Sequence, residues 1–227
     1  MPDLPALNRY RRSDIRTIPT AWTFVAREGS PTGSEGGTYA VAVARLLLLI
    51  DIQRDYFPGG AHPLVEPDAA AEAAARLLTA FRAAGERVVH VQHVSTAADA
   101  AFFAPGTAGV EFDERVAPDG EEHVVVKHRP NAFLGTGLES LLRSAEPDEI
   151  VVAGMMSSMC VDATVRAASD LGFSLSVAQD ACAAPDLRLG PTTVPGAQVH
   201  AAFMAALDGT YARVADADTL AAAAALR

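Results

Sequence analysis

The segment 150-IVVAGMMSSMCVDATVRAASDLGF-173 indicates the class of fold most clearly. Residues 150–153 form a continuous apolar run, which is typical of a strand buried on both faces. Beyond Gly154, residues 158–171 place their apolar side chains at helical intervals, with Cys160 in the first turn. A buried strand that leads directly into a helix is the repeating unit of a parallel sheet.

The same alternation continues through the chain from residue 46 onward. Further strands are expected at 46–50, 88–94, 123–126, 174–178 and 211–214. Further helices are expected at 67–84, 136–144, 196–207 and 219–226. This pattern predicts a three-layer, doubly wound α/β fold in which helices cover both faces of a parallel sheet. Such sheets bind ligands in the crevice beyond the carboxyl ends of their strands.

Residues 1–43 differ in composition from the rest of the chain. Proline, glycine, serine, threonine and arginine are mixed without a period, and 29-GSPTGSEGG-37 has the composition of a flexible linker. We therefore expect a disordered N-terminal extension over 1–43 and one folded domain over 44–227. The extension is either upstream sequence read as protein, with the true start near residue 41, or a docking arm.

Charge and cysteine content narrow the classes of function. The 28 acidic and 18 basic residues give a net charge of −10, which disfavours nucleic acid and anionic lipid as partners. The longest apolar stretch, 41–50, is interrupted by Arg45 and is too short to span a membrane, and the first residues lack a signal-peptide pattern. Two cysteines, Cys160 and Cys182, do not make a disulfide framework, so we expect a cytoplasmic protein.

Three chemically informative side chains come just after apolar runs. They are Asp51, Lys127 and Cys160. Lys127 is the one lysine among 18 basic residues, and the others are arginines. Either arginine cannot replace it at this position, or it is a surface lysine that has been retained by chance. Because parallel strands end at the same edge of a sheet, we expect a carboxylate, an ammonium and a thiol to converge.

Together these three groups could perform nucleophilic catalysis. A helix N-terminus and a nearby lysine would favour the thiolate of Cys160. Asp51 could take the thiol proton and later return it to a leaving amine, and backbone N–H groups after Gly154 could stabilise an oxyanion. Simpler roles are a helix cap or ion-pair partner for Asp51, a core position for Cys160 and a solvated charge for Lys127.

Five motifs resemble the isochorismatase-like cysteine hydrolases, over roughly residues 44–220. They are 51-DIQRDYF-57, 124-VVVKHRPNAF-133, 154-GMMSSMCVDATVRAASDLGF-173, 180-DACA-183 and 199-VHAAFMAALDG-209. The resemblance implies a six-stranded parallel sheet and a catalytic triad of Asp51, Lys127 and Cys160. It also implies a cis peptide between Met155 and Met156, which directs the amides of Met156 and Cys160 at the oxyanion, and a homo-oligomer, a dimer or larger.

The resemblance also narrows the reaction. Nicotinamidases in the family add a metal site built on Asp-x-His and a further His, whereas 90-HVQHVSTAADAAFF-103 has no carboxylate two residues before His90 or His93. We therefore expect no metal and no cofactor. Isochorismatases that cleave a vinyl ether often lack the cysteine, so Cys160 favours amide chemistry. Residues 154–173 are most similar to general bacterial cysteine hydrolases, including the streptothricin hydrolase type that opens a lactam.

The sequence thus predicts a metal-independent hydrolase of a small amide, lactam or ureido compound that acts through a thioester. The alternatives are an isochorismatase-type vinyl ether hydrolase and a catalytically idle member of the fold that binds a ligand or senses redox state. Four residues near the triad could line the substrate pocket: Gln53, Tyr56, Phe133 and Met159. We interpret the six histidines as structural or exposed and Cys182 as a packed thiol.

Overall fold

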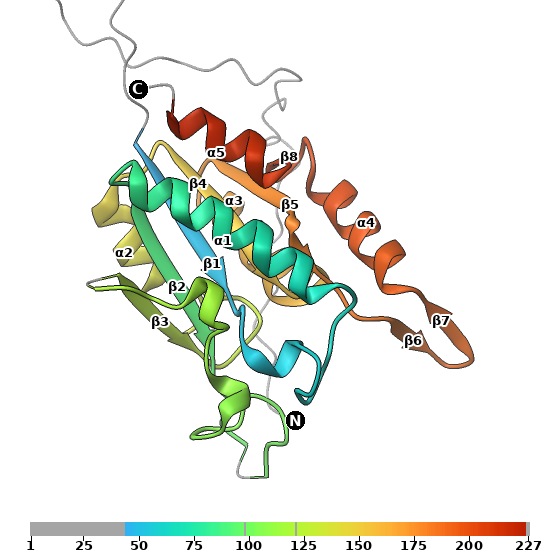
Figure 1. Ribbon diagram of the computed structural model, residues 1–227. Helices are drawn as coiled ribbons and strands as arrows, with labels where there is room; N and C mark the ends of the chain where they lie inside the picture. Colours follow the sequence, from blue (N-terminus) through green and yellow to red (C-terminus); the bar gives the residue numbers. More distant parts are fainter. Residues whose placement is uncertain (1–43, 98, 121, 226–227) are drawn as a thin grey trace, which may run out of the picture. The chain divides into compact units, whose positions relative to one another are not determined.

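The computed structural model describes residues 44–97, 99–120 and 122–225. The extension expected over 1–43 lies outside the described residues. Within the described part, a six-stranded sheet has helices on both of its faces (Figure 1). The predicted α/β class with a six-stranded parallel sheet is therefore confirmed.

The order of the strands creates a switch point at the centre of the sheet. The strands are, in spatial order, β3 (His123–Lys127), β2 (Arg87–His93), β1 (Arg45–Ile50), β4 (Glu149–Met155), β5 (Leu175–Ala183) and β8 (Arg213–Ala215). Every neighbouring pair is parallel. The chain moves outward from β1 through β2 to β3, then returns to the other side of β1 with β4. At such a reversal the connections leave in opposite directions, which opens a crevice beyond the carboxyl ends of the central strands.

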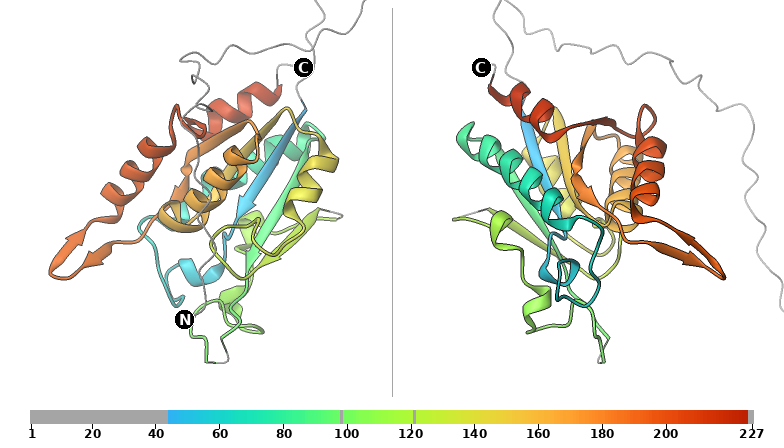
Figure 2. Two further views of the ribbon diagram at one scale, coloured as in Figure 1. Left: turned by 180° about the vertical axis from the view of Figure 1, so that it is seen from behind. Right: turned by 45° about the vertical axis from the view of Figure 1, so that its right-hand side comes forward.

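Two layers of helices cover the sheet (Figure 2). The helices on one face are α1 (Pro67–Ala83) and α5 (Ala217–Ala225). Those on the other face are α2 (Leu138–Ala145), α3 (Asp162–Asp170) and α4 (Gly196–Leu207). Successive side chains of a strand point to opposite faces, so Leu47 of β1 packs in the first core and Leu48 in the second. The apolar run of β1 is buried throughout because both of its faces are covered.

Several parts of the chain differ from the sequence-based expectation. The helix expected at 158–171 is a π-helical turn, Ser157–Val161, followed by α3. Strand β5 continues beyond the expected end because Cys182 pairs with Gly154. A two-stranded hairpin, β6 (Leu187–Leu189) and β7 (Thr192–Val194), was not expected and extends away from the sheet (Figure 1). Three short 3-10 helices were also not expected: η2 (Arg54–Tyr56), η3 (Ala108–Val110) and η4 (Glu114–Val116).

Gly154 permits the close approach of β4 to β1 near the edge where the strands end. Its φ of +148° lies in a region of backbone conformation that residues other than glycine rarely adopt. A Cβ atom at this position would lie 2.1 Å from the carbonyl oxygen of Ile50. Glycine therefore lets the chain pass directly from β4 into the turn that carries Cys160.

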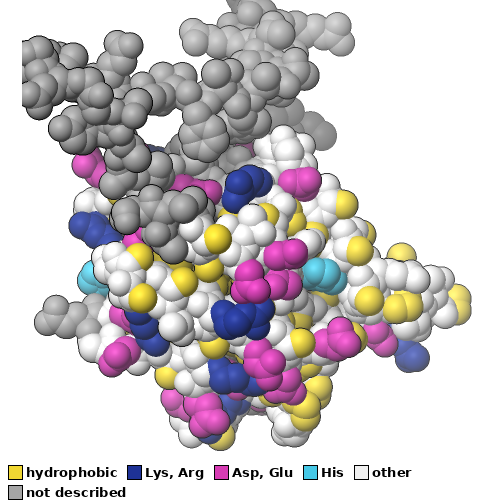
Figure 3. All heavy atoms as spheres, turned by 45° about the horizontal axis from the view of Figure 1, so that its top comes forward, with side chains coloured by type: hydrophobic (Ala, Val, Ile, Leu, Met, Phe, Trp, Pro, Cys, Tyr) yellow, Lys and Arg dark blue, Asp and Glu magenta, His cyan; other side chains and the backbone are white. Residues whose placement is uncertain are grey.

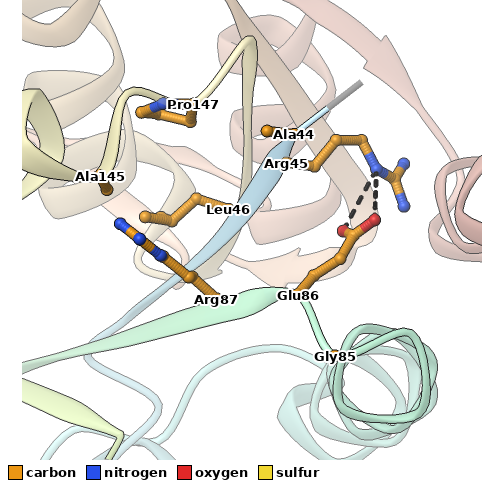
Figure 4. A pocket seen from close by; sticks show the side chains of 8 residues that line it. All are labelled: Ala44, Arg45, Leu46, Gly85, Glu86, Arg87, Ala145 and Pro147. Carbon is orange, nitrogen blue, oxygen red and sulfur yellow. Dashed lines mark hydrogen bonds and ion pairs between the residues drawn. The ribbon is translucent and has the colours of Figure 1, made fainter. Parts of the chain in front are cut away.

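A pocket of about 200 Å³ lies at the opposite end of the central strands (Figure 4). A buried ion pair between Arg45 and Glu86, with Nε 3.3 Å from a carboxylate oxygen, borders it. Arg45 also donates a hydrogen bond from Nη1 to the carbonyl oxygen of Leu220 (2.8 Å), which ties α5 to the start of β1. These contacts hold β1 and α5 together beside the pocket. Because the pocket lies at the opposite end of the central strands from Asp51, we do not assign it to the candidate active site.

The surface carries charges of both signs. On the face seen in Figure 3, acidic side chains lie beside basic ones. Arg76, for example, pairs with Asp218 at 3.1 Å. Among the described helices, none combines the length and the apolar composition that crossing a membrane requires.

Candidate active site

The carboxyl ends of four adjacent strands, β3, β2, β1 and β4, place four polar side chains close together. Asp51 follows β1 directly, His93 is the last residue of β2, and Lys127 is the last residue of β3. Cys160 lies in the π-helical turn after β4. The structure therefore brings Asp51, Lys127 and Cys160 together, as their positions after apolar runs predicted.

Lys127 connects the other two members of the predicted triad. Its Nζ lies 2.7 Å from Asp51 Oδ2 and donates a hydrogen bond to Cys160 Sγ at 3.2 Å. Nζ also donates to the carbonyl oxygen of Arg129 at 3.0 Å. Asp51 and Lys127 have no exposed surface, and Cys160 is 3% exposed. Removing one charge of such a buried pair leaves the other uncompensated, so the two charges are mutually dependent.

The surroundings of Asp51 change the pKa of its carboxyl group. Burial raises its pKa to about 6, and the charge of Lys127 and hydrogen bonds with Lys127 and Cys160 act in the opposite direction. Desolvation is therefore the larger effect, because it disfavours the charged carboxylate. Asp51 remains mainly ionised at neutral pH and is a stronger base than an exposed aspartate.

The thiol of Cys160 behaves differently from the sequence-based expectation. Burial is the main cause of a pKa well above that of an ordinary cysteine, and the negative charge of Asp51 raises it further. Lys127 lowers the pKa only in part. The expectation of a stabilised thiolate was therefore wrong: the helix terminus and the lysine are present, but desolvation outweighs them. Cys160 must lose its proton to a neighbouring base when it reacts.

His93 also contacts the site, although the sequence around it lacked the metal-site pattern and favoured a structural or exposed role. Its Nδ1 lies 3.2 Å from Lys127 Nζ, 3.9 Å from Cys160 Sγ and 3.8 Å from Asp51 Oδ2. Burial, followed by the charge of Lys127, lowers its pKa to about 4, so the ring is neutral at neutral pH. The signal that could have found it was its place at the end of the strand between β1 and β3.

The same cluster also contains side chains of the types that bind metal ions. Among the described residues, Asp51, His93 and Cys160 are the group whose ligand atoms converge, all within 4.8 Å of one another. The ammonium of Lys127 lies 2.7 Å from Asp51 Oδ2 and 3.2 Å from both Cys160 Sγ and His93 Nδ1. A positive charge of the protein itself thus stands among these atoms, and a metal ion would have to displace it.

Two of the four predicted pocket residues, Gln53 and Tyr56, are buried. Gln53 is fully buried, and its amide donates to the carbonyl oxygens of His93 (2.9 Å) and Val110 (2.7 Å) and accepts from the N–H of His93 (2.8 Å). Tyr56 is 1% exposed and packs edge-on against Phe103, with ring centroids 5.0 Å apart. Through these hydrogen bonds Gln53 holds the backbone at the end of β2 in place, a role that the sequence did not suggest.

The other two predicted pocket residues are more open. Met159 is 49% exposed although it directly precedes Cys160. Phe133 is half-buried and stacks on Phe173, with ring centroids 6.3 Å apart. An exposed apolar side chain beside a buried thiol could contact the apolar part of a small substrate.

The turn between β4 and Cys160 is firmly held. The peptide bond between Met155 and Met156 is cis, as the resemblance implied. The carbonyl oxygen of Met156 accepts hydrogen bonds from the N–H groups of Met159 (3.1 Å) and Val161 (3.2 Å). Ser157 Oγ lies 2.8 Å from His200 Nδ1, which links the turn to α4.

Comparison with known proteins agrees with this geometry. The isochorismatase domain matches residues 45–219. The isochorismatase family protein YddQ of Bacillus subtilis is 51% identical over 168 residues, covering 74% of this chain and 93% of that protein. A streptothricin hydrolase of Streptomyces noursei is 39% identical over 154 residues, covering 66% of this chain and 55% of that protein.

A solved structure of an isochorismatase hydrolase from Oleispira antarctica shares both sequence and fold. It is 48% identical, covers 81% of this chain and 99% of its own, and superposes with a TM-score of 0.77. The family match over residues 45–219 includes Asp51, Lys127 and Cys160. This chain belongs to the isochorismatase family of hydrolases.

Proposed function

We propose that the protein is a metal-independent cysteine hydrolase that cleaves the C–N bond of a small amide, lactam or ureido compound. One observation carries this proposal: a buried ammonium lies 2.7 Å from a carboxylate and 3.2 Å from a thiol sulfur, at the carboxyl end of a parallel sheet. Nucleophile, base and charge are thus within reach of one another, which is the arrangement that covalent catalysis requires. The streptothricin hydrolase among the relatives supports the assignment.

The reaction begins at the sulfur. Asp51, whose pKa is raised to about 6, takes the proton of Cys160 as the sulfur attacks the carbonyl carbon. A C–S bond forms and the carbonyl π electrons move to oxygen. Backbone N–H groups of Met156 and Cys160 are proposed to stabilise this oxyanion. When the oxyanion collapses, the C–N bond breaks, and Asp51 returns its proton to the leaving nitrogen.

Hydrolysis of the thioester restores the enzyme. Asp51, again ionised, takes a proton from water, and the resulting hydroxide adds to the thioester carbonyl. The C–S bond then breaks, the product carboxylic acid leaves, and the proton returns to Cys160. Lys127 is proposed to hold Asp51 in place and to stabilise the negative charge on sulfur in both half-reactions.

The pH dependence of turnover should report Asp51. Because Asp51 must be ionised to act as base and its pKa is raised to about 6, kcat/KM should fall tenfold per pH unit below pH 6. A pH profile from 4 to 9 on any amide that the enzyme turns over measures this limb. A limb near pH 4, the ordinary range of a carboxyl group, would mean that pairing with Lys127 outweighs burial.

Activity should be insensitive to chelation. The ammonium of Lys127 stands among the converging ligand atoms of the described residues, so no step needs a metal ion. We expect the enzyme to keep full turnover after prolonged dialysis against EDTA, measured beside an untreated sample. Loss of turnover that zinc or iron restores would contradict the metal-independent mechanism and favour a nicotinamidase-like reaction.

Two other functions predict different chemistry. An isochorismatase-type hydrolase would cleave isochorismate and leave a panel of amides intact, so the two substrate sets separate these reactions. A redox sensor needs an accessible thiol of low pKa, whereas Cys160 is buried and its pKa is raised. We also propose that the protein is cytoplasmic and that it forms a homo-oligomer. Light scattering of the purified protein would measure its oligomeric state.

A further inference from the structure

Lys127 has more acceptors than it has protons to donate. Its ammonium group carries three N–H donors. Four acceptors surround it: Asp51 Oδ2 at 2.7 Å, the carbonyl oxygen of Arg129 at 3.0 Å, and Cys160 Sγ and His93 Nδ1, both at 3.2 Å. Lys127 is fully buried, so these contacts account for its hydrogen bonding. One acceptor must therefore be without an N–H at any moment.

The shortest contacts identify which acceptors compete. The carboxylate and the carbonyl oxygen are nearest and are strong acceptors, so they hold two of the three protons. The third proton can go to Cys160 or to His93, which lie at equal distances. A protonated thiol is a weak acceptor, whereas the Nδ1 atom of a neutral imidazole is a good one. The neutral state of His93, whose pKa is about 4, keeps Nδ1 able to accept.

We propose that His93 is a positioning residue that competes with Cys160 for the third N–H of Lys127 and so holds the thiol in its protonated form until a substrate reacts. Both acceptors lie 3.2 Å from Nζ, and before a substrate reacts the better acceptor, His93 Nδ1, holds the third N–H for most of the time. When Asp51 takes the thiol proton, sulfur becomes an anion and a stronger acceptor, and the N–H moves from His93 to sulfur. Only one proton is transferred, from Cys160 to Asp51, and Lys127 keeps all three of its own.

The charged and titratable groups around the competing atoms are consistent with this exchange. Cys160 faces Asp51 and Lys127. Burial raises the pKa of the nearby Tyr56 phenol, and the charge of Cys160 raises it further. His93 faces Lys127 and Asp51, whose Oδ2 lies 3.8 Å from Nδ1. From the chain after β3 it faces His128 and Arg129, and the backbone of His128 also forms a hydrogen bond with it. Apart from Asp51, which gains the thiol proton, and Cys160, which loses it, none of these groups gains or loses a proton in the exchange. The hydrogen bond that changes its acceptor is the one that Lys127 donates to His93 or to sulfur.

Alkylation of Cys160 tests the inference without a substrate. Forming the thiolate in the wild type breaks the bond between Lys127 and His93, and His93→Phe has no such bond to break. We expect His93→Phe to react with iodoacetamide about tenfold faster at pH 8, which corresponds to a thiol pKa lower by about one unit. Peptide mass spectrometry from pH 6 to 9 gives the rate for Cys160, with Cys182 in the same molecule as internal reference.

His93→Asn is the matched control because its side chain keeps an acceptor near the place of Nδ1 but is smaller. Under the proposal it reacts within about twofold of wild type. If solvent access alone controlled the thiol, the order would reverse: asparagine would open the site and accelerate alkylation, and phenylalanine would fill it and slow alkylation. That reversed order, or equal rates for wild type and His93→Phe, would overturn the proposal.

Two further variants keep the test decisive. His93→Leu also removes the acceptor and should accelerate alkylation if His93→Phe fails to fold, as judged by its melting temperature. In a Lys127→Met background, His93→Phe should give no acceleration, because the effect acts through Lys127. An acceleration that persists there would contradict the proposal. The inference rests on the proposed role of Cys160 as nucleophile, but alkylation is independent of amide turnover, so the two can fail separately.

Discussion

Cys160→Ala should lose turnover by a factor on the order of 10⁴ or more, because it removes the atom that forms the covalent intermediate. The matched control is Cys182→Ala. Cys182 is the other buried thiol, burial raises its pKa to about 12, and it lies at the same edge of the sheet, paired with Gly154. We expect Cys182→Ala to keep turnover within a few fold of wild type.

The measurement is the rate of product release by each variant at a saturating concentration of a substrate amide, with melting temperatures alongside. Cys160→Ala should remain folded, since alanine replaces a small side chain. If Cys160→Ala retained a tenth of the wild-type rate, or if Cys182→Ala lost as much as Cys160→Ala, the assignment of the nucleophile would be wrong.

Lys127→Arg should reduce turnover by a factor on the order of a hundred or more, the scale typical of a positioned catalytic charge. The ammonium fits among four acceptors within 3.2 Å and has no exposed surface. A guanidinium is planar and wider, and it would separate Asp51 from Cys160 or bind the carboxylate in a fork. The sequence argument agrees, because 17 of the 18 basic residues are arginine and this one is not.

The burial of Lys127 changes the expected effect on stability. Keeping the charge would preserve folding at a surface position, but a larger side chain in a closed site is expected to cost about 1–3 kcal/mol of unfolding free energy. Turnover is therefore measured well below the melting temperature of the variant. The control is Arg166→Lys in the partly exposed ion pair with Asp162, which should change neither quantity. Near-wild-type turnover of folded Lys127→Arg would remove Lys127 from the mechanism.

The strands of the sheet could be predicted from sequence because their signals are local. Leu46 to Ile50 and Ile150 to Ala153 are continuous apolar runs, and both form central strands. The end of β5 was missed because Gln179 and Asp180 interrupt its apolar pattern, although the strand continues to pair with β4. The hairpin of β6 and β7 was missed because its side chains are exposed, so no buried face imposes a pattern.

Three of the four polar side chains of the candidate site could be predicted from sequence, whereas its electrostatics could not. Placement after apolar runs is enough to bring Asp51, Lys127 and Cys160 to one edge of the sheet. The direction of the thiol pKa depends on burial, which the sequence of the turn does not reveal. His93 was judged against a metal-site pattern, and its contact with Lys127 depends on the pairing of His93 with Lys127 between β2 and β3.

The most direct test of the central claim is a product-release screen with Cys160→Ala as the blank. Purified protein is incubated with primary amides, ureido acids and lactams. Ammonia is measured for the first two classes, and the mass gain of one water molecule is measured for the lactams. The account predicts release from at least one of these compounds by the wild type and none above background by Cys160→Ala. Turnover that Cys160→Ala matches, or cleavage of isochorismate with every C–N compound left intact, would contradict it.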